Sequence, residues 1–223
     1  MRMIKTEQAA ARAAVLIDLD GTLIDSSPGI FASLLYALAQ YDIHPARESL
    51  NKYLGPPLRV AFADFLPPAL IEEAVARYRE KYESEGLYDC ALYDGVREML
   101  QTLQGAGFAL CLATSKPRRF AQIILEHFGL AELFAYIGGA SMDGALDTKA
   151  QVIRDVLAQP CAQGCRAVMV GDRFHDMEGA RLCNLPAIAV LYGYGSAEEL
   201  RAYAPAFIAD TPQSFCEYLL ANY

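Results

Sequence analysis

Residues 13–23 read AAVLIDLDGTL, an apolar run that is followed at once by two aspartates, Asp18 and Asp20. A short apolar run bounded by Gly and Thr predicts a buried parallel strand, so Asp18 lies where the strand ends and the chain turns. Ligands of open α/β sheets bind at this edge. Residues i and i+2 of a strand point to the same face, and two like charges held there favour a divalent cation between them. The alternative is a plain acidic turn, because Asp and Gly are ordinary turn residues.

A second acidic pair follows another apolar run much later in the chain. Residues 166–176 read RAVMVGDRFHD. Asp172 and Asp176 are spaced i and i+4, which places them on one side of a loop that turns into a helix. We therefore expect four acids to converge on one edge of the sheet.

Two further segments carry groups that could bind an anion. Residues 108–117 read FALCLATSKP, a third apolar strand that ends in the hydroxyls of Thr114 and Ser115 and a helix-opening proline. Lys149 stands at the start of an apolar-periodic helix over residues 150–157 and supplies a point positive charge.

Taken together, these segments resemble the haloacid dehalogenase-like (HAD) superfamily, and within it the phosphatases similar to phosphoglycolate phosphatase. The resemblance covers nearly the whole chain. Four motifs occur in the family's order: DLDGTL at residues 18–23, then Thr114, then Lys149, then Gly171-Asp172 with Asp176. Four motifs in the right order are highly specific.

The resemblance implies catalytic roles for several of these residues. Asp18 would be the nucleophile and Asp20 the general acid and base. Thr114 and Lys149 would clamp the phosphate, and Ser115 would add a donor to it.

The resemblance also implies a magnesium ion as cofactor. Asp18, the carbonyl of Asp20 and Asp172 would be its ligands, and Asp176 would be a further ligand or a support for the others. The residues between the last two aspartates, 173–175, are RFH and are bulkier than the motif requires, but no reactive group is missing.

The residue types suit phosphoryl transfer independently of the family. A carboxylate can attack phosphorus and form an aspartyl-phosphate, which splits hydrolysis into two easier displacements. A second acid nearby can protonate the leaving group and then deprotonate the attacking water, and Asp20 is placed for both steps. Magnesium, Lys149 and the hydroxyls would neutralise charge on the phosphoryl oxygens. Because a dehalogenase needs neither Asp20 nor the metal, the pair favours phosphate esters as substrates.

Composition limits the class of protein. The chain has 223 residues, 54% of them hydrophobic, which is enough for a full core and an insertion. A formal net charge of -8 and the lack of a Lys/Arg-rich run argue against a nucleic-acid or membrane partner. We expect a soluble enzyme for a small phosphorylated metabolite, as a monomer or a homodimer.

The cysteines and the N-terminus bear on localisation. The six cysteines are scattered, and Cys161 and Cys165, the closest pair, lack histidines at zinc-site spacing. Reduced thiols in a cytoplasmic enzyme are the default expectation. Arg12 interrupts the apolar start of the chain, which then becomes the first catalytic strand, so we do not expect a cleaved signal peptide.

Periodicity predicts two domains. From residue 26 to residue 88 the strand signal gives way to helical spacing of apolar residues, which indicates a small helical cap. Residues 1–25 and 89–223 alternate helix and strand, which predicts an α/β core with a doubly wound parallel sheet, the Rossmannoid core of HAD proteins. A cap that follows the nucleophile loop could close over the site and exclude water.

Within the cap, residues 53–59, YLGPPLR, form the most loop-like segment and carry Arg59. This segment is our candidate specificity loop, with Arg59 bound to a second anionic group of the substrate. The alternative is a connection between helices in which Arg59 is simply solvated.

The prediction from sequence is a magnesium-dependent phosphatase, phosphoglycolate phosphatase-like, that acts through an aspartyl-phosphate. A phosphosugar mutase or a 5'-nucleotidase on the same fold remains an alternative, and so does a catalytically weak regulatory or binding protein. Phosphonate hydrolysis is less favoured because it would need a cap lysine, and Lys52 is the only amine near the loop.

Overall fold

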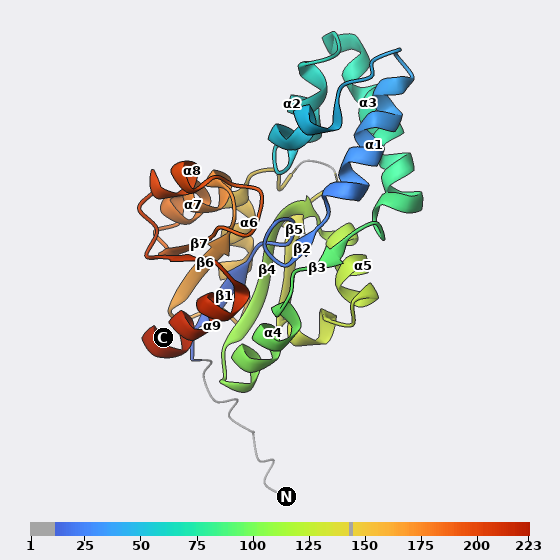
Figure 1. Cartoon of the computed structure of the whole chain (residues 1–223). Coiled ribbons are helices and arrows are strands. Elements are labelled where there is room, and N and C mark those ends of the chain that lie inside the picture. The colour runs from blue at the N-terminus through green and yellow to red at the C-terminus, as the bar shows by residue number, and fades with distance from the viewer. Residues whose placement is uncertain (1–11, 143–144) are drawn as a thin grey trace, which may run out of the picture.

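Six strands form one parallel sheet in the order β5-β4-β1-β6-β7-β8 (Figure 1). The computed structural model describes residues 12–142 and 145–223. The chain builds outward from β1 in one direction and then, after β5, returns to its other side, so the strand order reverses beside β1. Ligands of such sheets bind at this reversal, outside the carboxyl ends of the strands. The strands are β1 (Ala14–Ile17), β4 (Ala109–Pro117), β5 (Tyr136–Ala140), β6 (Ala167–Gly171), β7 (Ala187–Val190) and β8 (Phe207–Ala209).

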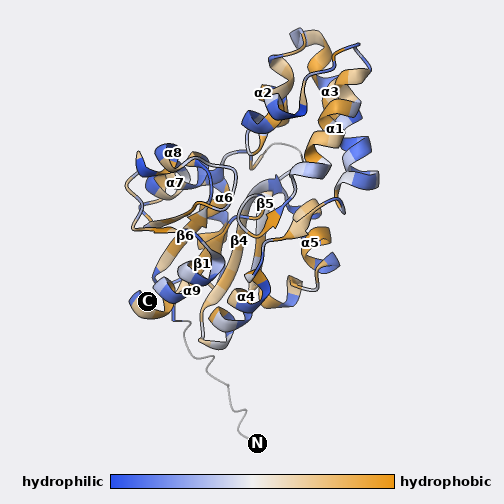
Figure 2. Cartoon of the chain, in the orientation of Figure 1, coloured by the Kyte–Doolittle hydropathy of each residue, from blue (hydrophilic) through white to orange (hydrophobic). Residues whose placement is uncertain are grey.

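The sheet is buried on both faces. Val15 and Ile17 of β1 belong to one apolar cluster, and Ala14 and Leu16 belong to another, as the two-residue period of a strand requires. Figure 2 shows apolar colouring on the strands and polar colouring on much of the outer helical surface. The first face is covered by α4 (Val96–Gly105), α5 (Arg118–His127) and α9 (Pro212–Asn222), and the second by α6 (Lys149–Leu157), α7 (Phe174–Leu182) and α8 (Ala197–Arg201).

A helical segment stands beyond the end of the sheet at which β1 leads into β2 (Figure 1). It leaves the sheet through β2 (Ile24–Asp25) and returns through β3 (Ala91–Leu92), and these two short strands pair antiparallel. The first and last residues of the segment are therefore side by side. Between them lie α1 (Ser27–Ala39), the 3-10 turn η1 (Arg47–Tyr53), α2 (Leu58–Ala63), α3 (Pro68–Lys81) and the π-helical turn η2 (Tyr82–Gly86).

The prediction of an α/β fold with a parallel, doubly wound sheet is confirmed. The apolar run of the third predicted strand stops before Thr114, but β4 continues to Pro117 because Thr114 pairs with Gly139 and Pro117 with Ala140 of β5. Consequently α5 begins at Arg118, with Pro117 as its N-cap. The first eleven residues of the predicted core lie outside the described residues.

The structure also shows the state of the cysteines and the character of the helices. None of the six cysteines, all within the described ranges, forms a disulfide, although Cys161 Sγ lies 3.7 Å from Cys111 Sγ. Among the helices of the described residues, none combines the length and apolar character that a membrane span requires.

Two glycines fix the base of the helical segment. Gly29 of α1 packs so closely on Gly86 of η2 that a Cβ on Gly29 would overlap the Gly86 carbonyl. Ser33, one turn along α1, completes this contact, since a Cβ on Gly86 would lie 2.9 Å from its hydroxyl oxygen. The start of α1 and the end of the segment are thereby packed backbone to backbone.

We expect Gly29→Ala to destabilise the protein by about 1–3 kcal/mol, because the overlap with backbone outweighs the roughly 1 kcal/mol by which Ala favours a helix over Gly. Urea unfolding measures the difference. Gly105→Ala is the matched control, since Gly105 is also helical but has open space around its Cα, and this variant should be as stable as the wild type or more so. Equal effects of the two substitutions would contradict the packing argument.

Candidate active site

The carboxyl ends of β1 and β6 bring the predicted acidic residues together. Asp18 directly follows β1 and Asp172 directly follows β6, and the backbone N–H of Asp18 donates to the Val170 carbonyl at 3.0 Å. The turn after Asp20 needs Gly21, whose φ is +82° and whose missing Cβ leaves room for the Asp172 carboxylate. The DLDGT turn is therefore shaped to receive the end of β6.

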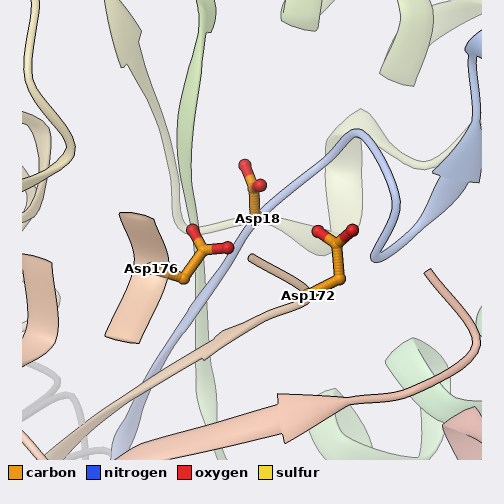
Figure 3. A group of neighbouring side chains, drawn as sticks. All are labelled: Asp18, Asp172 and Asp176. Carbon is orange, nitrogen blue, oxygen red and sulfur yellow. The ribbon is translucent and has the colours of Figure 1, made fainter. Parts of the chain in front are cut away.

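Asp18, Asp172 and Asp176 form a buried acidic trio. Figure 3 shows their side chains around a common space, each from a different segment: the end of β1, the end of β6 and the first turn of α7. One carboxylate oxygen of each lies within 4.8 Å of the others, and all three residues are buried. Like charges this close in the protein interior are costly unless a cation lies near them.

Lys149 supplies one such cation. Its Nζ lies 2.8 Å from Asp18 Oδ1 and 2.8 Å from Asp176 Oδ1, and it donates to the Ala113 carbonyl at 2.9 Å. The lysine is the first residue of α6, whose start is fixed by a capping box between Thr148 and Gln151. The prediction that Lys149 stands at the start of a helix is therefore confirmed.

The electrostatics show a shortage of positive charge. Burial raises the pKa of Asp18 from 3.8 to about 6, since Lys149 offsets the loss of solvation only in part, and Asp176 raises it further. Burial also raises the pKa of Asp172 well above its ordinary value, and the two other acids add to this. Burial lowers the pKa of Lys149, but Asp176 and Asp18 outweigh it, so the net shift is upward. One lysine does not balance three buried carboxylates.

The donor set of the trio suits a hard divalent cation. Asp18 Oδ1 and Asp176 Oδ1 are both buried, and although each is near Lys149, neither accepts a well-oriented hydrogen bond from any described residue. Asp172 is held in place by the Tyr194 N–H at 2.7 Å and the Thr22 hydroxyl at 3.3 Å. Carboxylate oxygens with an excess of negative charge are what Mg²⁺ prefers. The trio could therefore hold a metal ion.

The side chain of Asp20 lies apart from the trio. Its two oxygens lie 2.6 and 2.9 Å from Lys116 Nζ, and Oδ1 also accepts a short hydrogen bond from the Ser26 hydroxyl. Lys116 and Ser26 were not among the residues that the sequence predicted for the site. The signal for Lys116 was its i+2 spacing from Thr114 at a strand end, which places both on one face.

A cavity of about 460 Å³ opens above these residues, between the sheet and the helical segment. Its floor contains Asp18, Asp20, Thr114, Ser115 and Lys149, so the predicted catalytic residues face one space. Its roof is largely apolar and aromatic and includes Ile30, Tyr53, Pro57, Leu58, Val75, Tyr78, Tyr82 and, from the core, Phe120.

Arg59 also borders the cavity, but its guanidinium is engaged elsewhere. Its Nε and one terminal nitrogen donate to the Glu72 carboxylate at 2.6 and 2.9 Å. Both side chains are more than half exposed, so the pair is open to solvent and to exchange of partners. Its predicted contact with substrate stays a prediction.

Arg173, one of the bulky residues of the fourth motif, joins the sheet side of the site to the helical segment. It donates to the Leu54 carbonyl, pairs with Glu199 at 3.0 Å, and its backbone N–H donates to Asp176 at 3.1 Å. Gly55 lies against its side chain, with Arg173 atoms 3.5 Å from the position of an added Cβ. One residue thus contacts both the acidic trio and residues 54–55.

Sequence comparison identifies related proteins. The family model described as haloacid dehalogenase-like hydrolase matches residues 15–190. A 5'-nucleotidase from Pseudomonas aeruginosa is 40% identical over 194 residues, which are 86% of this chain and 88% of that protein. A phosphoglycolate phosphatase from Colwellia psychrerythraea is 30% identical over 218 residues, covering 88% and 92% of the two chains.

Solved structures agree as well. The crystal structure of "a predicted phosphatase from Clostridium acetobutylicum" superposes with a TM-score of 0.89 at 39% identity, over 96% of this chain and all of that one. The resemblance first drawn from four sequence motifs is thereby confirmed, and the chain belongs to the haloacid dehalogenase-like hydrolase family.

Proposed function

We propose that this chain is a magnesium-dependent phosphatase that hydrolyses a small phosphomonoester through an aspartyl-phosphate on Asp18. One observation carries the proposal. The two aspartates of the DLDGT turn face the same cavity but have different partners, since Asp18 lies with Lys149 and the acidic trio while Asp20 lies with Lys116 and Ser26. Two carboxylates with separate surroundings can take separate roles.

The first half-reaction transfers the phosphoryl group to the protein. A bond forms between a carboxylate oxygen of Asp18 and phosphorus, the ester P–O bond breaks, and Asp20 gives a proton to the departing alkoxide. Thr114 and Ser115, at the end of β4, and the ammonium of Lys149 are placed to bind the phosphoryl oxygens. The substrate phosphate would occupy the floor of the cavity.

The second half-reaction releases phosphate. A water molecule attacks phosphorus, Asp20 takes its proton, and the bond between phosphorus and Asp18 breaks. The carboxylate of Asp18 is then restored for the next cycle. Both half-reactions use the same acid and base from the same side, which fits the position of Asp20 beside the nucleophile.

Asp18, Asp172 and Asp176 are the side chains that would hold Mg²⁺, with the backbone carbonyl of Asp20 as a further ligand. When bound, the ion offsets the negative charge of the trio and of the phosphoryl oxygens. The upward pKa shifts of Asp18 and Asp172, and the pairing of only one lysine with three buried carboxylates, support this assignment.

We assign residues 26–88 as a cap and residues 1–25 and 89–223 as the core. The cap forms the roof of the cavity, and the paired strands β2 and β3 connect it to the core. A roof of apolar side chains over the phosphate site excludes water other than the one that reacts. Arg59 on α2 could exchange its partner Glu72 for an anionic group of a substrate.

The cavity favours a nucleoside monophosphate over phosphoglycolate as the substrate. Its volume of about 460 Å³ exceeds what so small an acid would fill, and lies in the range of roughly 300–1,000 Å³ that larger ligands occupy. The rings of Tyr53 and Phe120 line it, and bases pack well on such surfaces. The relative named 5'-nucleotidase supports this choice.

Two other functions on the same fold can be distinguished from a phosphatase, one by its products and one by its residues. A phosphosugar mutase would return the phosphoryl group to a sugar, so no inorganic phosphate would be released. A regulatory or binding protein would have no need for an intact set of Asp18, Asp20 and Lys149, which line one cavity, together with Asp172, which lies in the acidic trio.

One prediction of the proposed function concerns the metal, and it is measured as a change in the melting temperature, Tm. The folded pKa of Asp18, about 6, is above its ordinary value of 3.8, and that of Asp172 is raised too. The metal-free protein therefore loses stability as pH rises through this interval, because the folded state keeps protons that the unfolded chain releases. Mg²⁺ binds the ionised carboxylates, so we expect it to raise Tm more at about pH 7 than at about pH 5.

Asp172→Asn should greatly reduce the Tm increase produced by Mg²⁺. Asp210→Asn, a change at an exposed aspartate, should leave that increase intact. An unchanged Mg²⁺ effect in Asp172→Asn would contradict the metal assignment, and so would full turnover of an aryl phosphate in the presence of a chelator.

The second prediction separates the two aspartates. Asp18→Asn should abolish turnover and covalent phosphorylation, since the attacking group is lost. Asp20→Asn should still form phosphoenzyme from an aryl phosphate, whose leaving group needs little protonation, and the phosphoenzyme should then persist because water is not activated. Intact mass spectrometry of quenched reactions measures both. Asp42→Asn, at an exposed position whose positive φ Asn tolerates, is the control. Hydrolysis of alkyl phosphates by Asp20→Asn at the wild-type rate would refute the assignment.

The third prediction concerns the substrate. We expect kcat/KM for 5'-nucleoside monophosphates to exceed that for 2-phosphoglycolate, and also that for ribose 5-phosphate, which lacks the base, by about tenfold or more. Release of inorganic phosphate under magnesium gives all three values. A preference for phosphoglycolate, or equal rates with and without a base, would show that the aromatic roof does not bind a base.

A further inference from the structure

A second buried lysine, Lys116, faces the cavity beside Lys149. The two lysines have different partners. Lys149 lies between Asp18 and Asp176, whereas Lys116 contacts both oxygens of Asp20 and no other carboxylate within the described residues. Each aspartate of the DLDGT turn therefore has its own buried ammonium group.

The hydrogen-bond capacity of Lys116 is nearly used up by this arrangement. An ammonium group has three N–H donors. Two of them are directed to the Asp20 oxygens, at 2.6 and 2.9 Å, and Nζ also lies over the ring of Tyr82, 5.0 Å from its centroid. In this geometry at most one N–H of Lys116 is left for a substrate phosphate. Lys149, in contrast, lies 2.8 Å from a carboxylate oxygen of the nucleophile, Asp18.

The ring of Tyr82 is itself fixed in place. It stacks on Tyr78 with ring centroids 5.5 Å apart and planes 11° apart, and it meets Phe120 edge to face at 5.9 Å. Its hydroxyl has no hydrogen-bond partner among the residues that the structure describes, so the contacts of this side chain are made by the ring. A desolvated ring face near an ammonium stabilises the cation in that position.

The end of β4 directs Lys116 toward Asp20. The pairing of β4 with β5 shifts register between Thr114 and Pro117, and the Lys116 N–H donates to the Thr114 hydroxyl at 3.1 Å. The same irregular strand end thus sets the phosphate-binding hydroxyl and the ammonium group. This couples two neighbouring parts of the site through the Lys116 backbone N–H and the Thr114 side chain.

We propose that Lys116, held under the ring of Tyr82, is a positioning residue that orients the Asp20 carboxylate to take the proton of the attacking water. The inference rests on the proposed function. Both oxygens of Asp20 lie within hydrogen-bond distance of the ammonium, so Lys116 fixes the orientation of this carboxylate. Lys116 acts through Asp20 and makes no contact with the phosphoryl group.

The test uses the full chain with magnesium and an aryl phosphate as probe. Lys116→Met removes the ammonium but keeps an unbranched apolar side chain. Hydrolysis of the phosphoenzyme should slow by about ten- to a hundredfold, the range expected for a charged hydrogen bond, while its formation from the aryl phosphate changes little. Phosphoenzyme should therefore accumulate at steady state, and kcat should fall without a rise in KM. Lys52→Met, at an exposed lysine outside the cavity, should match the wild type.

Binding of inorganic phosphate gives a readout that does not depend on turnover. The Kd of the magnesium-loaded protein for phosphate, from calorimetry, should stay within about twofold of the wild-type value in Lys116→Met. A tenfold weaker Kd, or a higher KM with unchanged kcat, would overturn the proposal, because Lys116 would then be a phosphate ligand.

A pair of Tyr82 variants tests the ring without touching the lysine. Tyr82→Phe keeps the ring face and should behave as the wild type, whereas Tyr82→Leu should slow phosphoenzyme hydrolysis about two- to tenfold. If the two variants lose activity equally, the hydroxyl rather than the ring matters and the proposal is wrong. If the wild type and Asp20→Asn both fail to form any phosphoenzyme, the proposed function has failed instead.

Discussion

The main constraint on the structure is the mutual repulsion of three buried carboxylates at the carboxyl ends of β1 and β6, which the rest of the fold must offset. Asp18, Asp172 and Asp176 come from separate segments, and the sheet brings their oxygens within 4.8 Å. Carboxylates in this position cost free energy, which the ion pairs with Lys149 offset only in part. The capped start of α6 positions Lys149 beside these groups, and the Gly21 turn leaves room for the Asp172 carboxylate. A fold that tolerates such repulsion without a ligand gains stability from whatever cation binds there.

The sheet and the acidic residues could be predicted because their signals are local. An apolar run that ends in Asp or Gly marks a strand and its carboxyl end, and parallel strands share that edge. The convergence of Asp18 with Asp172 can therefore be predicted without knowing any distance in the structure. The position of Lys149 followed in the same way from a polar start, Asp147-Thr148, before a periodic apolar segment.

The partners of the second aspartate could not be predicted in this way. Contact of Lys116 with Asp20 and with the Tyr82 ring depends on how the helical segment packs on β4, which no local pattern encodes. The extension of β4 to Pro117 is similar, since it follows from pairing with β5 rather than from its own composition. Arg59 shows the same limit, because its partner Glu72 is on another helix. Contacts between segments distant in sequence require the tertiary structure.

The short pairing of β2 with β3 has a consequence for how such proteins diversify. Because the helical segment leaves and re-enters the sheet through adjacent backbone, with Ile24 opposite Leu92 and Asp25 opposite Ala91, its ends are already closed. Residues can be inserted, deleted or exchanged between those ends at little cost in loop-closure entropy and with no change in strand order. The surface that meets the variable part of a ligand can therefore evolve separately from the machinery that reacts, and new specificities can arise without a new fold.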